Sequence, residues 1–157
     1  MDTELEEKRA IAKFKKLRAK KNWINCPVLW INIIFTDQNF RHLTYKDKKH
    51  KRTPNEIKMR NICFLSVDKI IKSSWTYQEY LSEKEEIIIK KHGRKEKVFR
   101  EIEYIWLVAI VDWPTGKHRI RVVIKKIEWF SYGEYLSVMP ARKMKWHPNF
   151  MGWKFDV

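Results

Sequence analysis

The chain of 157 residues has few of the residues that mark flexible linkers or covalent frameworks. It contains four glycines, five prolines and two cysteines. The scarcity of glycine and proline argues against long linkers, and the length fits one domain. Cys26 and Cys63 lie far apart and follow no metal-binding spacing. We therefore predict neither a disulfide framework nor a structural zinc site.

Several catalytic motifs are also missing. The chain has no glycine-rich phosphate loop, no H-E-x-x-H zinc motif, no paired-carboxylate pattern and no serine-hydrolase elbow. Hydrolysis through a P-loop or metal ions, and glycosidase chemistry, therefore lack sequence support. We expect no metal and no cofactor.

No apolar run approaches the ~20 residues that a membrane span needs. The N-terminal segment is charged and helix-like, whereas a signal peptide has an apolar centre. These two features predict a cytoplasmic protein that does not span a membrane.

Positive charge is what the chain has in excess. It has 34 Lys and Arg against 19 Asp and Glu, a net charge of +15. Such a surplus repels itself unless an anionic partner is present, and nucleic acid is the leading candidate because phosphate binding releases counterions. A membrane surface and an acidic protein are weaker candidates. A compositional explanation is also open, because AT-rich genomes favour lysine codons and hence lysine-rich surfaces.

Hydrophobic residues make up 44% of the chain, which is enough for a core. Residues 4–21 predict a helix with acids in its first turn and bases in its last, and a partial apolar stripe of Leu5, Ile11, Phe14 and Leu17. The apolar run 28–35 predicts a strand buried on both faces. Thr53-Pro54-Asn55-Glu56 is typical of a capped helix start, and this helical region extends to about residue 72 with a break near Ser66.

Strands are predicted after residue 75, over 86–91, 98–111, 119–129 and 135–139. Their short, glycine-containing connections favour antiparallel neighbours. The pattern predicts an α+β domain in which N-terminal helices pack on a four- to five-stranded antiparallel sheet. We divide the chain into an N-terminal basic helix (1–25), a central domain (26–142) and a basic, aromatic tail (143–157).

The segment 40–60 carries the residues best suited to chemistry on phosphodiesters. His42 can carry a proton near neutral pH, and Arg52 and Arg60 can hold a phosphate. Cleavage of RNA through attack of its 2′-hydroxyl needs such a proton carrier and such cations. We expect further contacts with nucleic acid from Arg41, Lys49, His50 and Lys51.

Each of these residues also has a plainer interpretation. The plainer interpretation of His42 is a solvated loop residue, and that of His50 is a member of a solvated charge run. Arg60 lies four residues after Glu56 and can pair with it on one helix face. His118 and His147, in a predicted turn and in the tail, receive no role.

The last predicted strands supply a second group of candidates. Ser137 is a candidate catalytic donor to a phosphate oxygen, and Tyr135, two residues earlier, is expected on the same face, where it can stack on a base. Arg119, Arg121 and Lys125 alternate with apolar residues, so they form a row that can contact nucleic acid. The alternatives are that Ser137 bonds nearby backbone and that the row is an ordinary polar face.

Four features occur in order along residues 30–142: Phe40-x-His42, Lys49-His50-x-Arg52, a helix with Glu56 and Arg60, and Tyr135-Leu136-Ser137-Val138-Met139-Pro140. This order resembles the barnase, EndoU, colicin and RelE-like (BECR) superfamily of small nucleases, in particular its phage- and mobile-element-associated branch. The resemblance implies a helix-plus-four-stranded-sheet fold with the active site on the exposed sheet face. It also implies metal-independent RNA cleavage to a 2′,3′-cyclic phosphate.

If the chain is a toxin of this kind, an acidic immunity or antitoxin protein is expected to cover its basic groove. Two other functions stay open. One is a non-catalytic nucleic-acid-binding module, and the other is an accessory protein of a phage or mobile element.

Overall fold

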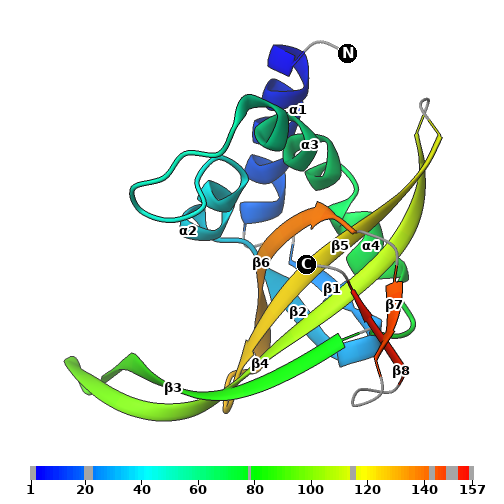
Figure 1. Ribbon diagram of the computed structural model, residues 1–157. Coiled ribbons are helices and arrows are strands. Elements are labelled where there is room, and N and C mark those ends of the chain that lie inside the picture. Colours follow the sequence, from blue (N-terminus) through cyan, green and yellow to red (C-terminus); the bar gives the residue numbers. More distant parts are fainter. Residues whose placement is uncertain are drawn as a thin grey trace.

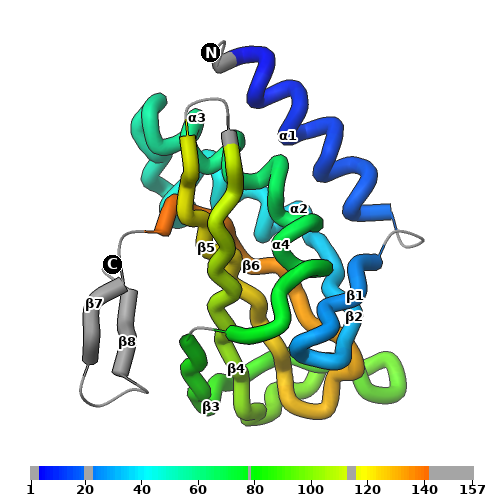
Figure 2. The backbone as a smooth tube through the Cα atoms, turned by 90° about the vertical axis from the view of Figure 1, so that its right-hand side faces the viewer, coloured from blue at the N-terminus to red at the C-terminus, as the bar shows by residue number. Residues whose placement is uncertain are grey.

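The computed structural model describes residues 3–19, 23–77, 79–113, 116–141, 144–147 and 152–155. It is an α+β structure in which helices cover one face of a sheet (Figures 1 and 2). The helices are α1 (Thr3–Arg18), α2 (Asp37–Phe40), α3 (Pro54–Phe64) and α4 (Val67–Ser73), with the short 3-10 turns η2 (Pro27–Leu29) and η3 (Arg41–Leu43). The strands are β1 (Ile24–Cys26), β2 (Ile31–Ile34), β3 (Glu79–Lys91), β4 (Arg94–Trp113), β5 (Gly116–Ile127), β6 (Tyr132–Pro140), β7 (Met144–His147) and β8 (Gly152–Phe155).

Six strands form one mixed sheet in the order β1-β2-β6-β5-β4-β3, and β7 and β8 form a separate pair. The four neighbouring pairs other than β2 and β6 are antiparallel. The meander predicted after residue 75 is confirmed for the three pairs that β3, β4, β5 and β6 form. The prediction of a purely antiparallel sheet is wrong at β2 and β6, which run parallel with Ile33 opposite Gly133. The reason is long-range: β2 pairs with a strand that follows it by about a hundred residues, so no local turn sets its direction.

The predicted strand 28–35 is shorter than expected. Pro27 starts a 3-10 turn, and Trp30 closes it in the left-handed region at φ 58°. Only Ile31–Ile34 then pair as a strand. Proline lacks a backbone N–H for the ladder, which explains why an apolar run of strand length begins with a turn.

The N-terminal signals of the α3 helix are confirmed. The Thr53 hydroxyl accepts from the Glu56 N–H at 3.3 Å, and the Glu56 carboxylate accepts from the Thr53 N–H at 2.9 Å. Pro54 fills the first turn, where a missing N–H costs nothing. Helix α4 follows after Ser66, at the predicted break.

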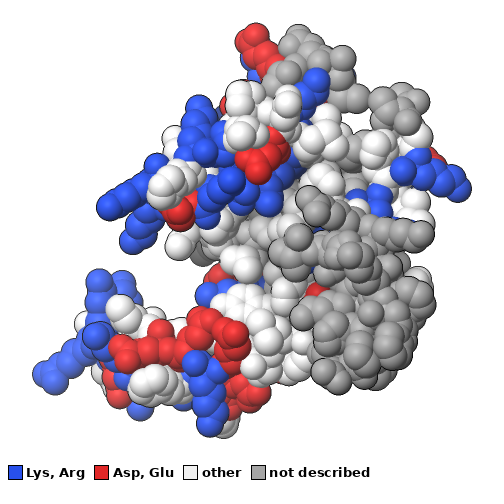
Figure 3. Space-filling model, in the orientation of Figure 1, with Lys and Arg blue, Asp and Glu red and all other residues white. Residues whose placement is uncertain are grey.

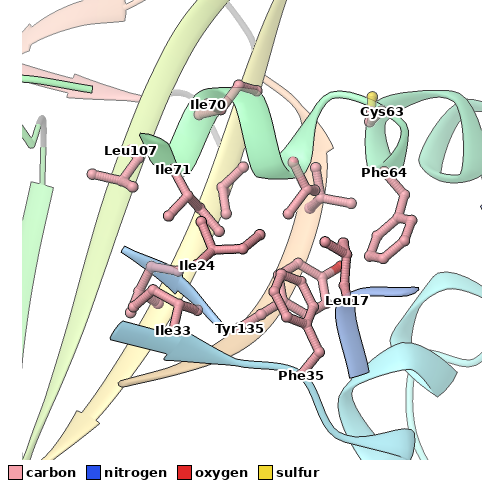
Figure 4. Packing of buried hydrophobic residues seen from close by; sticks show 14 of the residues in the cluster. Leu17, Ile24, Ile33, Phe35, Cys63, Phe64, Ile70, Ile71, Leu107 and Tyr135 are labelled. Carbon is pink, nitrogen blue, oxygen red and sulfur yellow. The ribbon is translucent and has the colours of Figure 1, made fainter. Parts of the chain in front are cut away.

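The core lies between the helices and the covered face of the sheet (Figure 4). The Tyr135 ring of β6 stacks on Phe35 at 5.1 Å between centroids and meets Phe64 of α3 edge-on at 5.5 Å. Helix α1 adds Phe14, which stacks on Phe40 at 4.1 Å. The buried positions of α1 are Glu6, Ala10, Phe14 and Leu17, whereas the predicted stripe members Leu5 and Ile11 are exposed.

No helix in the described part of the chain combines the length and apolar character that crossing a bilayer requires.

Candidate functional site

The basic loop between α2 and α3 is closed on itself by backbone contacts. The N–H of Arg52 donates to the Thr44 carbonyl at 2.8 Å, and Tyr45 and Lys51 form an isolated antiparallel bridge. At the loop tip, an Asp47 carboxylate oxygen accepts the backbone N–H groups of Lys49 and His50. These contacts give the loop a defined shape although most of its side chains are charged.

This loop and the end of α2 enclose a surface hollow of about 500 Å³. We call it the basic hollow; it is lined by Gln38, Arg41, His42, Tyr45, Lys46, Asp47 and Lys48. The Arg41 guanidinium lies over the Tyr45 ring, 5.2 Å from its centroid, which is cation–π distance. Figure 3 shows Lys and Arg side chains gathered on this part of the molecule, at the upper left.

Two arginines, Arg52 and Arg60, lie near His42. The Arg52 Nε donates to the His42 carbonyl at 2.9 Å. Arg60, on α3, donates from a terminal nitrogen to the Val138 carbonyl of β6 at 3.1 Å. Both side chains are partly buried, and within the described residues neither lies within ion-pair distance of a carboxylate.

The local electrostatics follow from this crowding of positive charge. Partial burial, with Arg52 and Arg60 nearby, lowers the pKa of His42 below its ordinary value of 6.5. Burial and the neighbouring Arg52 lower the pKa of Arg60 to about 10. At neutral pH the imidazole of His42 is therefore mostly uncharged, and the guanidinium group of Arg60 keeps its charge.

The structure thus brings together three of the four predicted catalytic residues: His42, Arg52 and Arg60. Arg60 and Glu56 form no ion pair within 4 Å, although the Glu56 charge still acts on Arg60. Glu56 caps its own helix and lies 3.7 Å from the Lys46 ammonium group. Arg41 lines the hollow as well. The other predicted loop contacts, Lys49, His50 and Lys51, are exposed at its tip.

His50 is held beside the Asp47 carboxylate, with its Nδ1 2.8 Å from the nearer oxygen. The same carboxylate accepts two backbone N–H groups, so Asp47 and His50 together close the loop tip. This pairing assigns His50 a role in loop structure.

Ser137 does not join the other three, because a β-bulge changes the expected register. Tyr135 lies opposite Ile124 and Ser137 lies opposite Val123, so Leu136 is the extra residue of β6. Since neighbouring residues on β5 point to opposite faces, Tyr135 and Ser137 do too. The prediction that they share a face is wrong. Ser137 projects from the face away from the helices, which we call the far face.

The predicted role of Tyr135 in base stacking is also wrong. Its side chain is fully buried under the helices, and its hydroxyl has no hydrogen-bond partner among the described residues. Burial raises the pKa of this phenol. The apolar neighbours Phe35 and Phe64 explain why the ring serves the core.

Arg119, Arg121 and Lys125 do share a face, since β5 pairs with β4 without a break over these positions. It is the far face, so the sheet separates this row from the basic hollow. Arg121 is only 8% exposed, and its guanidinium donates to the Met139 sulfur. The prediction that this row contacts nucleic acid is therefore wrong for Arg121. The side chains of Arg119 and Lys125 are half-buried.

Sequence reasoning missed Tyr45, Lys46 and Lys48, which line the hollow beside His42. A detectable pattern was present, because Tyr45 is an aromatic residue set among the bases Arg41, Lys46 and Lys48. An aromatic ring interleaved with bases suits stacking and phosphate contact together.

The hollow can bind an anion and can accept a proton at His42. The cations Arg41, Lys46 and Lys48 outnumber the one carboxylate in its lining, Asp47, and this excess of positive charge favours a bound anion. Among the described residues, no three His, Cys, Asp or Glu side chains gather where a metal ion could be held.

Comparisons of the chain with protein-family models, with curated proteins and with solved structures gave no match.

Proposed function

We propose that this chain binds the phosphodiester backbone of nucleic acid in the basic hollow. One observation carries the proposal: Arg41, Lys46 and Lys48 line the hollow together with His42, and Arg52 and Arg60 lie close enough to His42 to lower its pKa. A phosphate would bring negative charge to this cluster of cations. Arg41 and Lys48 lie at the outer wall of the hollow, where they can contact neighbouring phosphates.

The ring of Tyr45 supports a single-stranded ligand. It lies half-buried in the hollow with the Arg41 guanidinium against it. An unpaired base can stack on such an aromatic–arginine platform, whereas bases in a duplex are already stacked. We therefore propose single-stranded RNA or DNA, or the single-stranded part of a folded RNA, as the ligand class.

The binding test compares two double variants of equal charge change. Arg41→Gln/Lys48→Gln removes two charges from the hollow, and Lys69→Gln/Lys72→Gln removes two from exposed positions of α4. Fluorescence anisotropy with a labelled single-stranded RNA is measured over a salt series. We expect the hollow variant to lower the slope of log K against log salt by about 1.4, from roughly 0.7 per phosphate contact. The α4 variant should retain the wild-type slope. Equal losses in both variants, or no binding by the wild type, would contradict the proposal.

A second candidate function, metal-independent cleavage of RNA, is favoured by the uncharged imidazole of His42. In this reaction His42 would take the proton of a 2′-hydroxyl, whose oxygen attacks the adjacent phosphorus. Arg52 and Arg60 would stabilise the charge gathering on the phosphate oxygens. The 5′-oxygen would leave with a proton from a hollow ammonium group such as Lys46, giving a 2′,3′-cyclic phosphate. The BECR resemblance implies the same products.

The cleavage test uses total RNA in excess chelator, with wild type and His42→Ala compared. We expect His42→Ala to lower the cleavage rate by at least about 100-fold, the usual contribution of a general base, while RNA affinity changes only a few-fold. Product ends are analysed for cyclic phosphate. Binding without cleavage by the wild type at any pH would reject the ribonuclease and leave the binding proposal intact.

A further inference from the structure

A two-stranded ribbon made by the ends of β3 and β4 projects from the body of the molecule. Strand β3 pairs with β4 from Glu79 to Lys91, but β5 pairs with β4 only from Ile102 onward. Residues 84–91 and 94–101 therefore form a ribbon with no third strand, which we call the arm. Figure 1 shows the arm leaving the body of the molecule at the lower left, and Figure 3 shows both signs of charge on it.

The arm exposes apolar side chains that a free ribbon would not need. Ile88 is 63% exposed and Phe99 is 70% exposed. Ile87, Ile89 and Val98 are half-exposed on the opposite side of the ribbon. An isolated two-stranded ribbon is marginally stable in water, and three or more strands with an apolar face are needed for independent stability.

The outer edge of the arm is the edge of the whole six-stranded sheet. Strand β3 is last in the strand order, so its outward N–H and C=O groups have no strand partner in that sheet. A long edge of this kind is a template for pairing with another strand.

Charge within the arm is unbalanced at its tip. Lys90 lies opposite Lys95, and Lys91 lies opposite Arg94, so four bases face one another across the ribbon. Like charges directly opposite on paired strands are destabilising. Two of the acids of β3, Glu85 and Glu86, lie on the other side of the three isoleucines, where Glu85 accepts from the Tyr104 hydroxyl and Glu86 lies 3.5 Å from the Lys97 ammonium group.

The order of residues 85–91 is self-complementary: two acids, three isoleucines and two bases. We propose that two copies of this chain pair through their β3 edges, antiparallel, about a two-fold axis at Ile88. In this register Glu86 of each copy lies opposite Lys90 of the other, Glu85 lies opposite Lys91, and Ile87 lies opposite Ile89.

This register is selected by charge and burial together. A two-fold axis perpendicular to the sheet places identical residues opposite one another at its centre. Centring on Ile87 would oppose Lys84 with Lys90 and pair Glu86 with an isoleucine. Centring on Ile89 would oppose two isoleucines with lysines. Only centring on Ile88 pairs all three isoleucines with each other and both acids with bases.

Pairing would also cover exposed apolar side chains of the arm and offset the facing positive charges at its tip. The two ribbons would become one four-stranded sheet, in which Val98 and Ile87 of one copy adjoin Ile89 of the other on one side. Each copy's acids would lie beside the bases at the other copy's tip, which relieves the facing positive charges.

The test uses reversed charges and sedimentation or light scattering of the full chain, freed of nucleic acid so that no ligand bridges two copies. We expect a wild-type dimer. Glu85→Lys/Glu86→Lys and Lys90→Glu/Lys91→Glu should each be monomeric, because each opposes like charges across the axis. One variant raises the net charge by four and the other lowers it by four, so loss of the dimer in both excludes a general charge effect. The control Lys69→Glu/Lys72→Glu, on α4, should remain dimeric.

Mixing the two monomeric variants is the decisive experiment. The four introduced charges then face opposite charges, so an equimolar mixture should form a one-to-one heterodimer. Recovery of the dimer also shows that both variants fold. A monomeric wild type at the highest soluble concentration, a dimer that survives either reversal, or a mixture that stays monomeric would each overturn the proposal.

Discussion

The surroundings of His42 disfavour its charged form, and this makes the stability of the folded chain depend on pH. Burial and two nearby guanidinium groups lower the pKa of His42 below 6.5. Between the lowered pKa of the folded chain and the ordinary value of 6.5, the unfolded chain binds more protons at this site than the folded chain does. The folded state is therefore favoured above this pH window and loses stability as the pH falls through it.

We predict that His42→Gln removes this loss. Between about pH 7.5 and about pH 5, the free energy of unfolding of the wild type should fall more steeply than that of the variant. Urea denaturation at a series of pH values measures both curves. Parallel curves would mean that His42 titrates alike in the folded and unfolded chains.

Tyr135 gives a second residue-scale prediction, because its buried hydroxyl has no hydrogen-bond partner among the described residues. Tyr135→Phe keeps the stacked ring and removes the unsatisfied group, so the free energy of unfolding should stay equal or rise by about 1 kcal/mol. Tyr135→Ala should lose about 3–5 kcal/mol by opening a cavity. Chemical denaturation compares the two. A clear loss in Tyr135→Phe would reveal a partner for the hydroxyl.

The residues at the site could be predicted from their chemical types. His42, Arg52 and Arg60 stand out in the sequence by their chemistry, and they do lie together. Tyr135 and Ser137 could not be placed correctly, because one extra residue in β6 reverses the facing of every later side chain. Such a bulge leaves no mark in a sequence of alternating strand residues.

At the scale of elements, the close approach of β2, β6 and β5 depends on Gly133. A Cβ atom there would lie 3.0 Å from the Cδ1 atoms of Ile31 and Ile33 and 3.1 Å from Cγ2 of Ile124. Three branched side chains therefore fill the space that any other residue would need.

We predict that Gly133→Ala lowers the free energy of unfolding by about 1–3 kcal/mol through overpacking. Ile31→Val removes one of the contacting methyl groups, so the double variant should be more stable than the two single losses imply. A double-mutant cycle by urea denaturation measures this coupling. Strict additivity would show that the strands separate to admit the methyl group.

Elements whose signals are local were predicted well. The Thr53 cap, the helix break at Ser66 and the His92-Gly93 hairpin turn all occur where the sequence indicated. The parallel pairing of β2 with β6 was not predictable, because it is decided by packing between segments distant in sequence. The strands β7 and β8 were missed because the tail has no period of two.

For the whole molecule, the net charge of +15 sets a general repulsion. Added salt should screen this repulsion. Salt also weakens the ion pairs, but most of them are exposed and contribute little to stability. We predict that the Tm rises with added KCl. For a chain of this length each kcal/mol gained raises the Tm by about 2–4 °C.

Differential scanning calorimetry over a KCl series measures this shift, with sucrose at matched osmolality as the uncharged control. A Tm that falls as KCl is added would mean that specific ion pairs outweigh the general repulsion. An anion that occupies the basic hollow, such as a short oligonucleotide, should raise the Tm further at low salt.

The sequence by itself determined the class of fold, the starts of α1, α3 and α4, most strand positions and the excess of positive charge, because these depend on neighbouring residues and on composition. Tertiary structure decided which charges meet. It placed Arg52 and Arg60 behind His42, buried Tyr135, and put the sheet between the loop and the row of Arg119, Arg121 and Lys125. Those outcomes depend on strand order and on one bulge, which arise from packing across the whole chain.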